Sequence, residues 1–214
     1  DEYSTEQNPI HTYSLSGLYT VTLIVTDNHG FTDTEIKENY ISVNYSGPTW
    51  HISVDGSDEN DGSEENPYLT IQKGIDASSD GDTVLVQAGT YVENITWSAT
   101  NGIKLIANGR ETCIIDGNQL SSVIRFEEAL GGIIDTTTLI TGFTIQNGHP
   151  QLTWPGNAGG GIYCSDNTSP SISNVIITGN TAGAGAGIYC GSNTTLSNSI
   201  IQGNTGTSDG GGIC

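Results

Sequence analysis

The sequence predicts an all-β chain whose larger part is a β-solenoid, in which short strands stack coil upon coil. Copies of a Gly-x-Gly-Ile line begin at Gly159, Gly185 and Gly210, 26 and then 25 residues apart, a period typical of solenoids. Between the copies, β-branched runs end at Asn180 and Asn204, each preceded by a glycine, which favours strands and turns over helices. Each period is therefore expected to form one coil.

Residues 1–44 are expected to form antiparallel strands instead. The run 17–27 alternates apolar and mostly threonine positions, as a strand with one packed face does, residues 27–30 suit a turn, and 31–43 suit a second strand. Together with the line NPIHTY at 8–13, this run resembles the second half of a PKD domain, an immunoglobulin-like β-sandwich of secreted and cell-surface proteins. The resemblance implies a partial sandwich, and we expect the chain to begin inside that domain.

A linker is expected at 45–49 and the solenoid at 50–214. Residues 50–54 suit a strand, an acidic loop follows, and the spacing of Leu69, Ile71 and Ile75 predicts a short amphipathic helix over 68–78. A stack of coils exposes its core at each end, so this helix is expected to cap the first coil.

Strand-like runs of less regular spacing follow at 103–106, 113–117, 123–126 and 139–145. Residues 149–156 interrupt the repeat with Pro150, Trp154 and Pro155, and are expected to project as a loop. Because the chain ends within a repeat line, we expect the natural protein to continue beyond Cys214.

Alternation assigns side chains to the two faces of the coil. Ile162 and Cys164 are expected to point inward and Tyr163 outward. The next copy would stack Cys190 on Cys164, either as a disulfide or as buried free thiols, and Tyr189 on Tyr163. The aligned Asn180 and Asn204 are expected to bond along the stack and to turn backbone rather than to a ligand.

These lines resemble the pectin-lyase-like right-handed parallel β-helix superfamily, in particular the repeats of polymorphic outer-membrane-type and right-handed β-helix region proteins. The resemblance covers about residues 50–214 and implies a right-handed parallel β-helix with an N-terminal capping helix. It implies no single activity, because the superfamily includes lyases, hydrolases, adhesins and scaffolds.

The net charge of −19 argues against nucleic acid and against an anionic membrane surface as partners. No apolar run approaches the ~20 residues of a membrane helix, so no membrane insertion is expected. The polar repeats and the two resemblances predict an extracellular or cell-surface location, with a polysaccharide or cell-surface glycan as the expected partner.

The acidic loop offers Asp55, Asp58 and Asp61 as oxygen ligands for Ca²⁺, although it lacks the EF-hand spacing. The alternative is a solvated polar loop. We expect no obligatory cofactor, and Ca²⁺ is the ion that this loop would hold.

The sequence of the predicted solenoid offers few candidate catalytic residues. Lyases of the superfamily use calcium or a basic residue against the substrate carboxylate and an Arg or Lys as base, which makes Lys104, Arg110 and Arg125 the candidates. Hydrolases of the superfamily use grouped aspartates, whereas Asp116 and Asp135 are isolated in this sequence.

An aromatic strip is the third candidate site. Tyr163 and Tyr189, with Trp154 from the projecting loop, would offer ring faces on which sugars stack. The alternative is that this tyrosine column packs beneath a loop or supports the stack.

The sequence therefore favours part of a modular extracellular protein that acts as a scaffold or adhesin with carbohydrate contact. The alternative is a polysaccharide lyase or glycoside hydrolase whose active coils lie mostly outside these residues.

Overall fold

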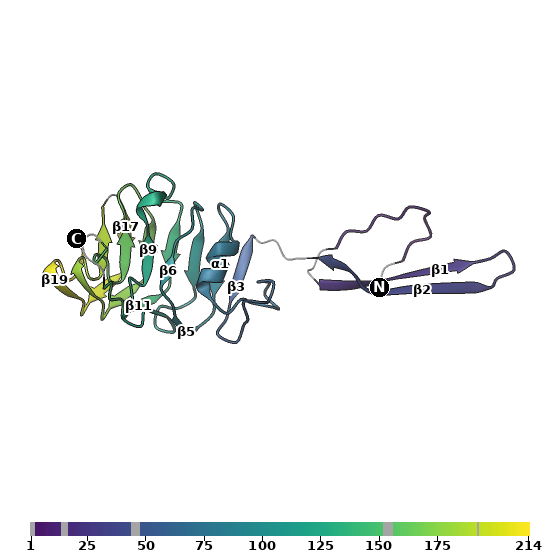
Figure 1. Ribbon diagram of the computed structural model, residues 1–214, viewed down its shortest axis with the longest axis horizontal. Coiled ribbons are helices and arrows are strands. Elements are labelled where there is room, and N and C mark those ends of the chain that lie inside the picture. Colours follow the sequence, from purple (N-terminus) through teal and green to yellow (C-terminus); the bar gives the residue numbers. More distant parts are fainter. Residues whose placement is uncertain (1–2, 14–16, 44–47, 152–155, 192) are drawn as a thin grey trace. The chain divides into compact units, whose positions relative to one another are not determined.

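The computed structural model describes residues 3–13, 17–43, 48–151, 156–191 and 193–214 (Figure 1). The chain divides into two compact units, Asp1–Ser46 and Gly47–Cys214. The second contains the stacked strands, which Figure 1 shows succeeding one another in chain order from α1 to β19.

The first unit contains an antiparallel pair, β1 (Gly17–Thr26) and β2 (Thr32–Val43). The turn between them is closed by the Asp27 amide, which donates to the Phe31 carbonyl at 2.9 Å. Both predicted strands are confirmed, but the predicted packed face is wrong for the described residues. Leu23 is 60% exposed and Ile24, on the opposite face, 62% exposed, because no second sheet covers the pair within the described residues.

The second unit is a right-handed parallel β-helix built from three parallel sheets and a short parallel pair. Sheet one contains β3 (Thr49–Ile52), β4 (Thr83–Val86), β7 (Lys104–Ala107), β10 (Leu139–Thr141), β13 (Ser171–Ser173) and β17 (Thr195–Ser197). Sheet two contains β5 (Gly89–Val92), β8 (Cys113–Asp116), β11 (Thr144–Gln146), β14 (Ile176–Thr178) and β18 (Ile200–Gln202). Sheet three contains β6 (Ile95–Thr96), β9 (Ile124–Phe126), β12 (Ile162–Cys164) and β16 (Ile188–Cys190), and the short pair is β15 (Thr181–Ala184) with β19 (Thr205–Asp209).

The core consists of columns in which one apolar side chain from each coil stacks on the next. On sheet three, the register aligns Ile124 with Ile162 and Ile162 with Ile188, and an isolated bridge adds Ile213. This confirms the predicted isoleucine column. Equivalent columns line sheets one and two, so apolar surface is buried continuously along the stack.

Helix α1 (Ile71–Ala77) covers the first coil, as predicted, beside β3 (Figure 1). Thr70 is its N-cap and accepts a hydrogen bond from the Lys73 amide, so the helix starts later than the predicted residue 68. Its buried side holds Ile71, Gly74 and Ile75. A Cβ on Gly74 would come within 2.7 Å of Ile52, which explains why a glycine allows this close approach.

The repeated Gly and Asn positions have structural causes. A Cβ on Gly161 would lie 2.5 Å from the Gly187 carbonyl oxygen of the next coil, so only glycine fits there. Asn180 is fully buried, and its Oδ1 accepts from the Gly148 amide at 2.7 Å. Its Nδ2 donates to Asn204 Oδ1 at 3.0 Å. The predicted asparagine ladder is therefore confirmed.

The four cysteines are free thiols. Cys164 and Cys190 are paired in register, as predicted, and Cys164 is fully buried. Burial raises the pKa of the Cys164 thiol to about 12. Among the residues that the structure describes, no helix is both long and apolar enough to cross a bilayer.

Candidate functional site

A row of polar side chains crosses the outer face of sheet two, one from each of four neighbouring strands. The strand register aligns Asp116 with Gln146, Gln146 with Thr178, and Thr178 with Gln202. The residue before each of them faces the core, as fully buried Ile115 does, so the row itself points outward. We call these four residues the polar row.

The carboxylate of Asp116, in the polar row, is held by three hydrogen bonds. Its Oδ2 accepts from Gln146 Nε2 at 2.9 Å and from Asn147 Nδ2 at 2.7 Å, and its Oδ1 accepts from the Asn118 amide at 2.9 Å. Burial alone would raise the pKa of Asp116, but these three hydrogen bonds lower it below its ordinary value. The carboxylate is therefore ionised at neutral pH and held in one orientation.

The turns that follow Asp116 and Gln146 have left-handed backbone at non-glycine residues, whereas glycines take this conformation after Thr178 and Gln202. The φ angles are +48° at Asn118, +56° at Gln119 and +58° at Asn147. Asparagine tolerates this region, whereas glutamine is rarely found there. Asn174 and Asn198 adopt the same region after strands β13 and β17 of sheet one, so these angles mark the tight turns of the coil.

Further amides and an imidazole surround these turns. Gln151 Nε2 lies 3.1 Å from His149 Nδ1 and donates to the Gln119 carbonyl at 3.5 Å. Together with Asp116 and Asn147, these groups place donors and acceptors on one edge of sheet two. Planar carboxylate and amide groups of this kind can bind the hydroxyls of a polyhydroxylated ligand.

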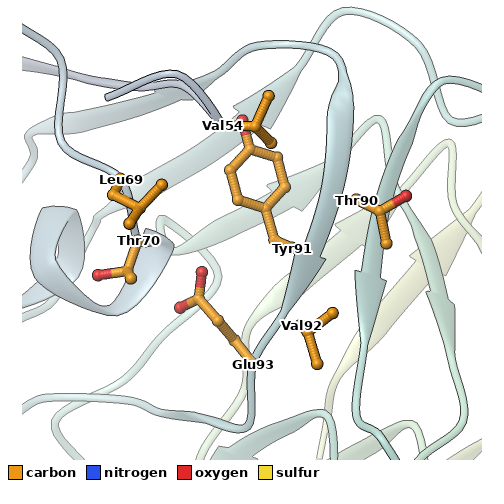
Figure 2. A pocket seen from close by; sticks show the side chains of 7 residues that line it. All are labelled: Val54, Leu69, Thr70, Thr90, Tyr91, Val92 and Glu93. Atoms are coloured by element: carbon orange, nitrogen blue, oxygen red, sulfur yellow. The ribbon is translucent and has the colours of Figure 1, made fainter. Parts of the chain in front are cut away.

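A pocket opens at the first strand of sheet two, where Val92 is aligned with Asp116 (Figure 2). Its volume is about 270 Å³. The lining combines apolar and polar side chains, namely Val54, Leu69, Thr70, Thr90, Tyr91, Val92 and Glu93. The pocket therefore extends the outer face of sheet two toward the capping helix.

Glu93 is the acidic group of this pocket, and Figure 2 shows its carboxylate directed toward Thr70. Its two oxygens accept from the backbone amides of Ile71 at 2.9 Å and Gln72 at 3.0 Å. Burial raises the pKa of Glu93, while these two bonds partly offset the rise. Glu93 thus ties the capping helix to sheet two and adds a partly buried acid beside the polar row.

The candidate catalytic cations lie in different parts of the β-helix. Lys104, on sheet one, donates to the Gly81 carbonyl at 3.1 Å. Arg110 precedes β8 and donates to the Asn198 carbonyl at 3.0 Å. Arg125, on sheet three, pairs with Glu127 at 2.8 Å. The structure does not bring these three side chains into one site.

The two aspartates that look isolated in the sequence differ in the structure. Asp135 accepts from the Thr137 amide at 2.8 Å and so closes its own turn. Asp116, by contrast, is joined to Gln146 and Asn147 of the next coil. Within the described residues, no hydrogen bond or ion pair joins either aspartate to a second carboxylate, but Asp116 is bound to two amides that lie about thirty residues later in the sequence.

The two tyrosines of the predicted aromatic strip differ in exposure, because Tyr163 is buried and Tyr189 is partly exposed. Tyr163 and Tyr189 stack with ring centroids 5.5 Å apart, as predicted, but Tyr163 is only 3% exposed. The Arg125 guanidinium lies 3.8 Å from its ring centroid, and its hydroxyl donates to Glu128 of the 3₁₀-helix η1 (Glu128–Leu130). The prediction of an open aromatic strip is therefore corrected for Tyr163, which Arg125 and Glu128 cover, whereas Tyr189 is partly exposed. Trp154 lies outside the described residues.

The acidic loop uses its carboxylates to hold its own fold. Asp58 accepts from the Leu69 and Thr70 amides at 3.0 and 2.9 Å, and Asp61 accepts from the Ser63 amide at 3.0 Å. Asp55 is exposed at the start of the loop. In the described ranges, no three His, Cys, Asp or Glu side chains gather as a metal site would require.

The polar row was missed at the sequence level, although a signal for it exists. Asp116, Gln146, Thr178 and Gln202 each end a short β-branched or aromatic run, and an alignment of those four runs superposes them. The irregular length of the earlier coils hides this alignment, because the obvious repeat begins only at Gly159.

Comparison with known proteins assigns the first unit. Residues 1–43 match the family model described as PKD domain. This stretch is a PKD segment. Residues 54–98 match the family DUF1565, described as protein of unknown function, and all seven pocket-lining residues lie within this range. The chain therefore joins a PKD segment to a right-handed parallel β-helix.

One relative is the uncharacterized protein YwoF of Bacillus subtilis (strain 168), which is 31% identical over 107 residues, or 48% of this chain. The match covers 23% of YwoF, so the chain spans about a quarter of the length of that relative. A solved pectin methylesterase variant in complex with a hexasaccharide is 15% identical, with a TM-score of 0.44, over 70% of this chain and 48% of the other.

Proposed function

We propose that this chain is part of an extracellular scaffold or adhesin and that the outer face of its sheet two binds carbohydrate. PKD domains and β-helices are both typical of modular extracellular proteins, and their combination supports that setting. The observation that carries the proposal is the polar row, in which Asp116 is held by Gln146 and Asn147 on an outward face.

The chemistry of the polar row suits hydroxyl recognition. Carboxylate oxygens accept hydrogen bonds, amides both donate and accept, and the Thr178 hydroxyl does both. Neighbouring strands lie ~4.8 Å apart, so these groups repeat at the spacing of successive coils. A chain molecule with repeating hydroxyl groups can therefore contact several of them at once.

The geometry favours binding over turnover. The three candidate cations are engaged at separate places, and Asp116 is held ionised, so it is a poor general acid at neutral pH. We therefore place polysaccharide cleavage second to carbohydrate contact.

The experiment uses the full chain on a panel of neutral, amino-sugar and uronate oligosaccharides, with binding measured by calorimetry. We expect binding to at least one of them, weakened about tenfold by Gln146→Ala or Gln202→Ala, since each change removes hydrogen-bonding groups. Thr195→Ala on the outer face of sheet one is the matched control and is expected to bind as the parent does.

Reducing ends and ultraviolet absorbance from unsaturated product are followed in the same samples. Turnover that is lost on changing Lys104, Arg110 or Arg125 to Ala would replace the binding account with an enzymatic one. Failure to bind any member of the panel would contradict the proposal.

A further inference from the structure

We infer that the carbohydrates preferred by this face carry free, protonated amino groups. The inference rests on the proposed function and specifies its ligand class. It depends on where the acidic and basic side chains of the β-helix lie relative to the polar row.

Asp116 offers an ionised carboxylate whose three hydrogen-bond donors are all neutral. A carboxylate has about four acceptor positions, so these donors leave roughly one for a ligand. The side chain is half-buried, and none of the ion pairs found among the described residues includes it. An ammonium group on a ligand would supply the charged donor that the protein does not.

The basic side chains of the β-helix are engaged elsewhere. Each of the four has its own partner: Lys73 lies over the Tyr68 ring, Lys104 binds the Gly81 carbonyl, Arg110 binds Glu111 and the Asn198 carbonyl, and Arg125 binds Glu127. Arg110 lies at the beginning of the sheet-two strands, where Thr144 Oγ1 donates to its carbonyl at 2.6 Å. Asp116, by contrast, is the last residue of β8, so the two residues flank opposite ends of that strand.

A ligand with carboxylates would therefore meet repulsion without compensation. The chain has a net charge of −19, and such a charge repels polyanions over a Debye length. Uronate chains are thus disfavoured, whereas chains of amino sugars are attracted both by Asp116 directly and by the overall field.

The pocket beside Val92 favours the same class of ligand, carbohydrates that carry protonated amino groups. The Glu93 amide donates to the Asp116 carbonyl at 3.0 Å, so pocket and polar row adjoin. The pocket contains the Glu93 carboxylate together with apolar Val54 and Leu69, each 42% exposed. An acid beside apolar side chains suits a ring with one apolar face and a cationic substituent.

The test compares glucosamine oligomers with N-acetylglucosamine oligomers of the same length and with galacturonate oligomers, using the full chain at ~0.15 M salt. We expect the glucosamine oligomers to bind about tenfold more tightly than the acetylated ones, since a hydrogen bond to a charged group is the stronger kind. Galacturonate oligomers are expected to bind weakest.

Asp116→Asn should abolish the preference for the free amine, whereas Asp166→Asn, an equal charge change at an exposed site away from sheet two, should leave it intact. If Asp116→Asn does not fold, as judged by circular dichroism, the preference for the free amine is tested with Thr178→Lys instead. It adds a cation to the polar row and should reduce the preference at least about fivefold, whereas an unchanged preference would overturn the inference.

Equal binding of acetylated and free oligomers would overturn the inference and leave carbohydrate binding standing. A preference lost equally in Asp116→Asn and Asp166→Asn would show attraction to net charge alone, which also overturns it. Tighter binding of galacturonate oligomers than of glucosamine oligomers would also overturn the inference. Absence of binding to all three oligomers and to the wider panel would remove the proposed function and the inference together.

Discussion

Asn180 shows how one buried side chain links three coils. It accepts from Gly148, donates to the Ile145 carbonyl at 3.1 Å, and bonds to Asn204 through its Nδ2 and its backbone amide. A buried amide is tolerated only when its polar atoms are hydrogen-bonded, and the hydrogen bonds of Asn180 run along the axis of the β-helix. Asn180 therefore fixes the turn between β14 and β15 against its neighbours.

Asn180→Ala should lower the free energy of unfolding by about 2–3 kcal/mol, because the buried Gly148 amide and Ile145 carbonyl lose their partner. Urea denaturation followed by circular dichroism measures this change. Asn108→Ala, at an exposed position, is the matched control and should change stability by less than about 0.5 kcal/mol. Equal effects of the two substitutions would argue against the asparagine ladder.

The residue pattern correctly predicted which side chains point into the core and which point away from it, but it did not predict how exposed the outward side chains are. The alternation around Tyr163 correctly assigned Ile162 and Cys164 to the core. It did not reveal that Arg125 and Glu128 cover the tyrosine, because Arg125 comes from the aligned strand β9 and Glu128 from the η1 segment that follows that strand. Period-two alternation reports the face of a strand and says nothing about loops that fold over that face.

At the scale of elements, helix α1 closes the end of the core. Ile71 and Ile75 are fully buried, and the helix contacts β3, β4 and β6. Its seven residues are too few for stability in isolation, so tertiary packing must hold it. Glu93 contributes by accepting from the first two amides of the helix.

Ile75→Ala should lower the free energy of unfolding by about 2–5 kcal/mol, the usual range for truncating a buried isoleucine. It should also increase the binding of a hydrophobic dye, since the end of the first coil is less well covered. Asp76→Ala on the exposed side of the same helix serves as the control, with little change expected. A stability loss for Asp76→Ala as large as that for Ile75→Ala would contradict the capping role.

The elements themselves were largely predictable, whereas the candidate site was not. The helix and the strands of the intermediate coils follow from apolar periodicity, with bounds that shift by a few residues. The polar row depends on which residue of one coil lies beside which residue of the next. Coils of unequal length conceal that register until the backbone is known.

At the scale of the whole molecule, charge is distributed unevenly. The net charge is −19, yet residues 145–214 contain only Asp166 and Asp209 as charged side chains of the Asp, Glu, Lys and Arg type. The later coils thus present Ser, Thr, Asn and Gln to solvent, and Asp116 is the charged member of the polar row. A largely neutral, hydroxyl- and amide-rich surface with one fixed carboxylate is the basis for the proposed carbohydrate contact.

The most direct test of that contact is the location of the bound oligosaccharide, measured by amide chemical-shift changes on titration of the labelled full chain. If the oligosaccharide binds the polar row, the largest changes are expected at 116–119, 146–149, 178 and 202, with saturation at a common affinity. Changes concentrated on sheet one or sheet three would contradict the assignment of the binding face, even if the chain binds carbohydrate.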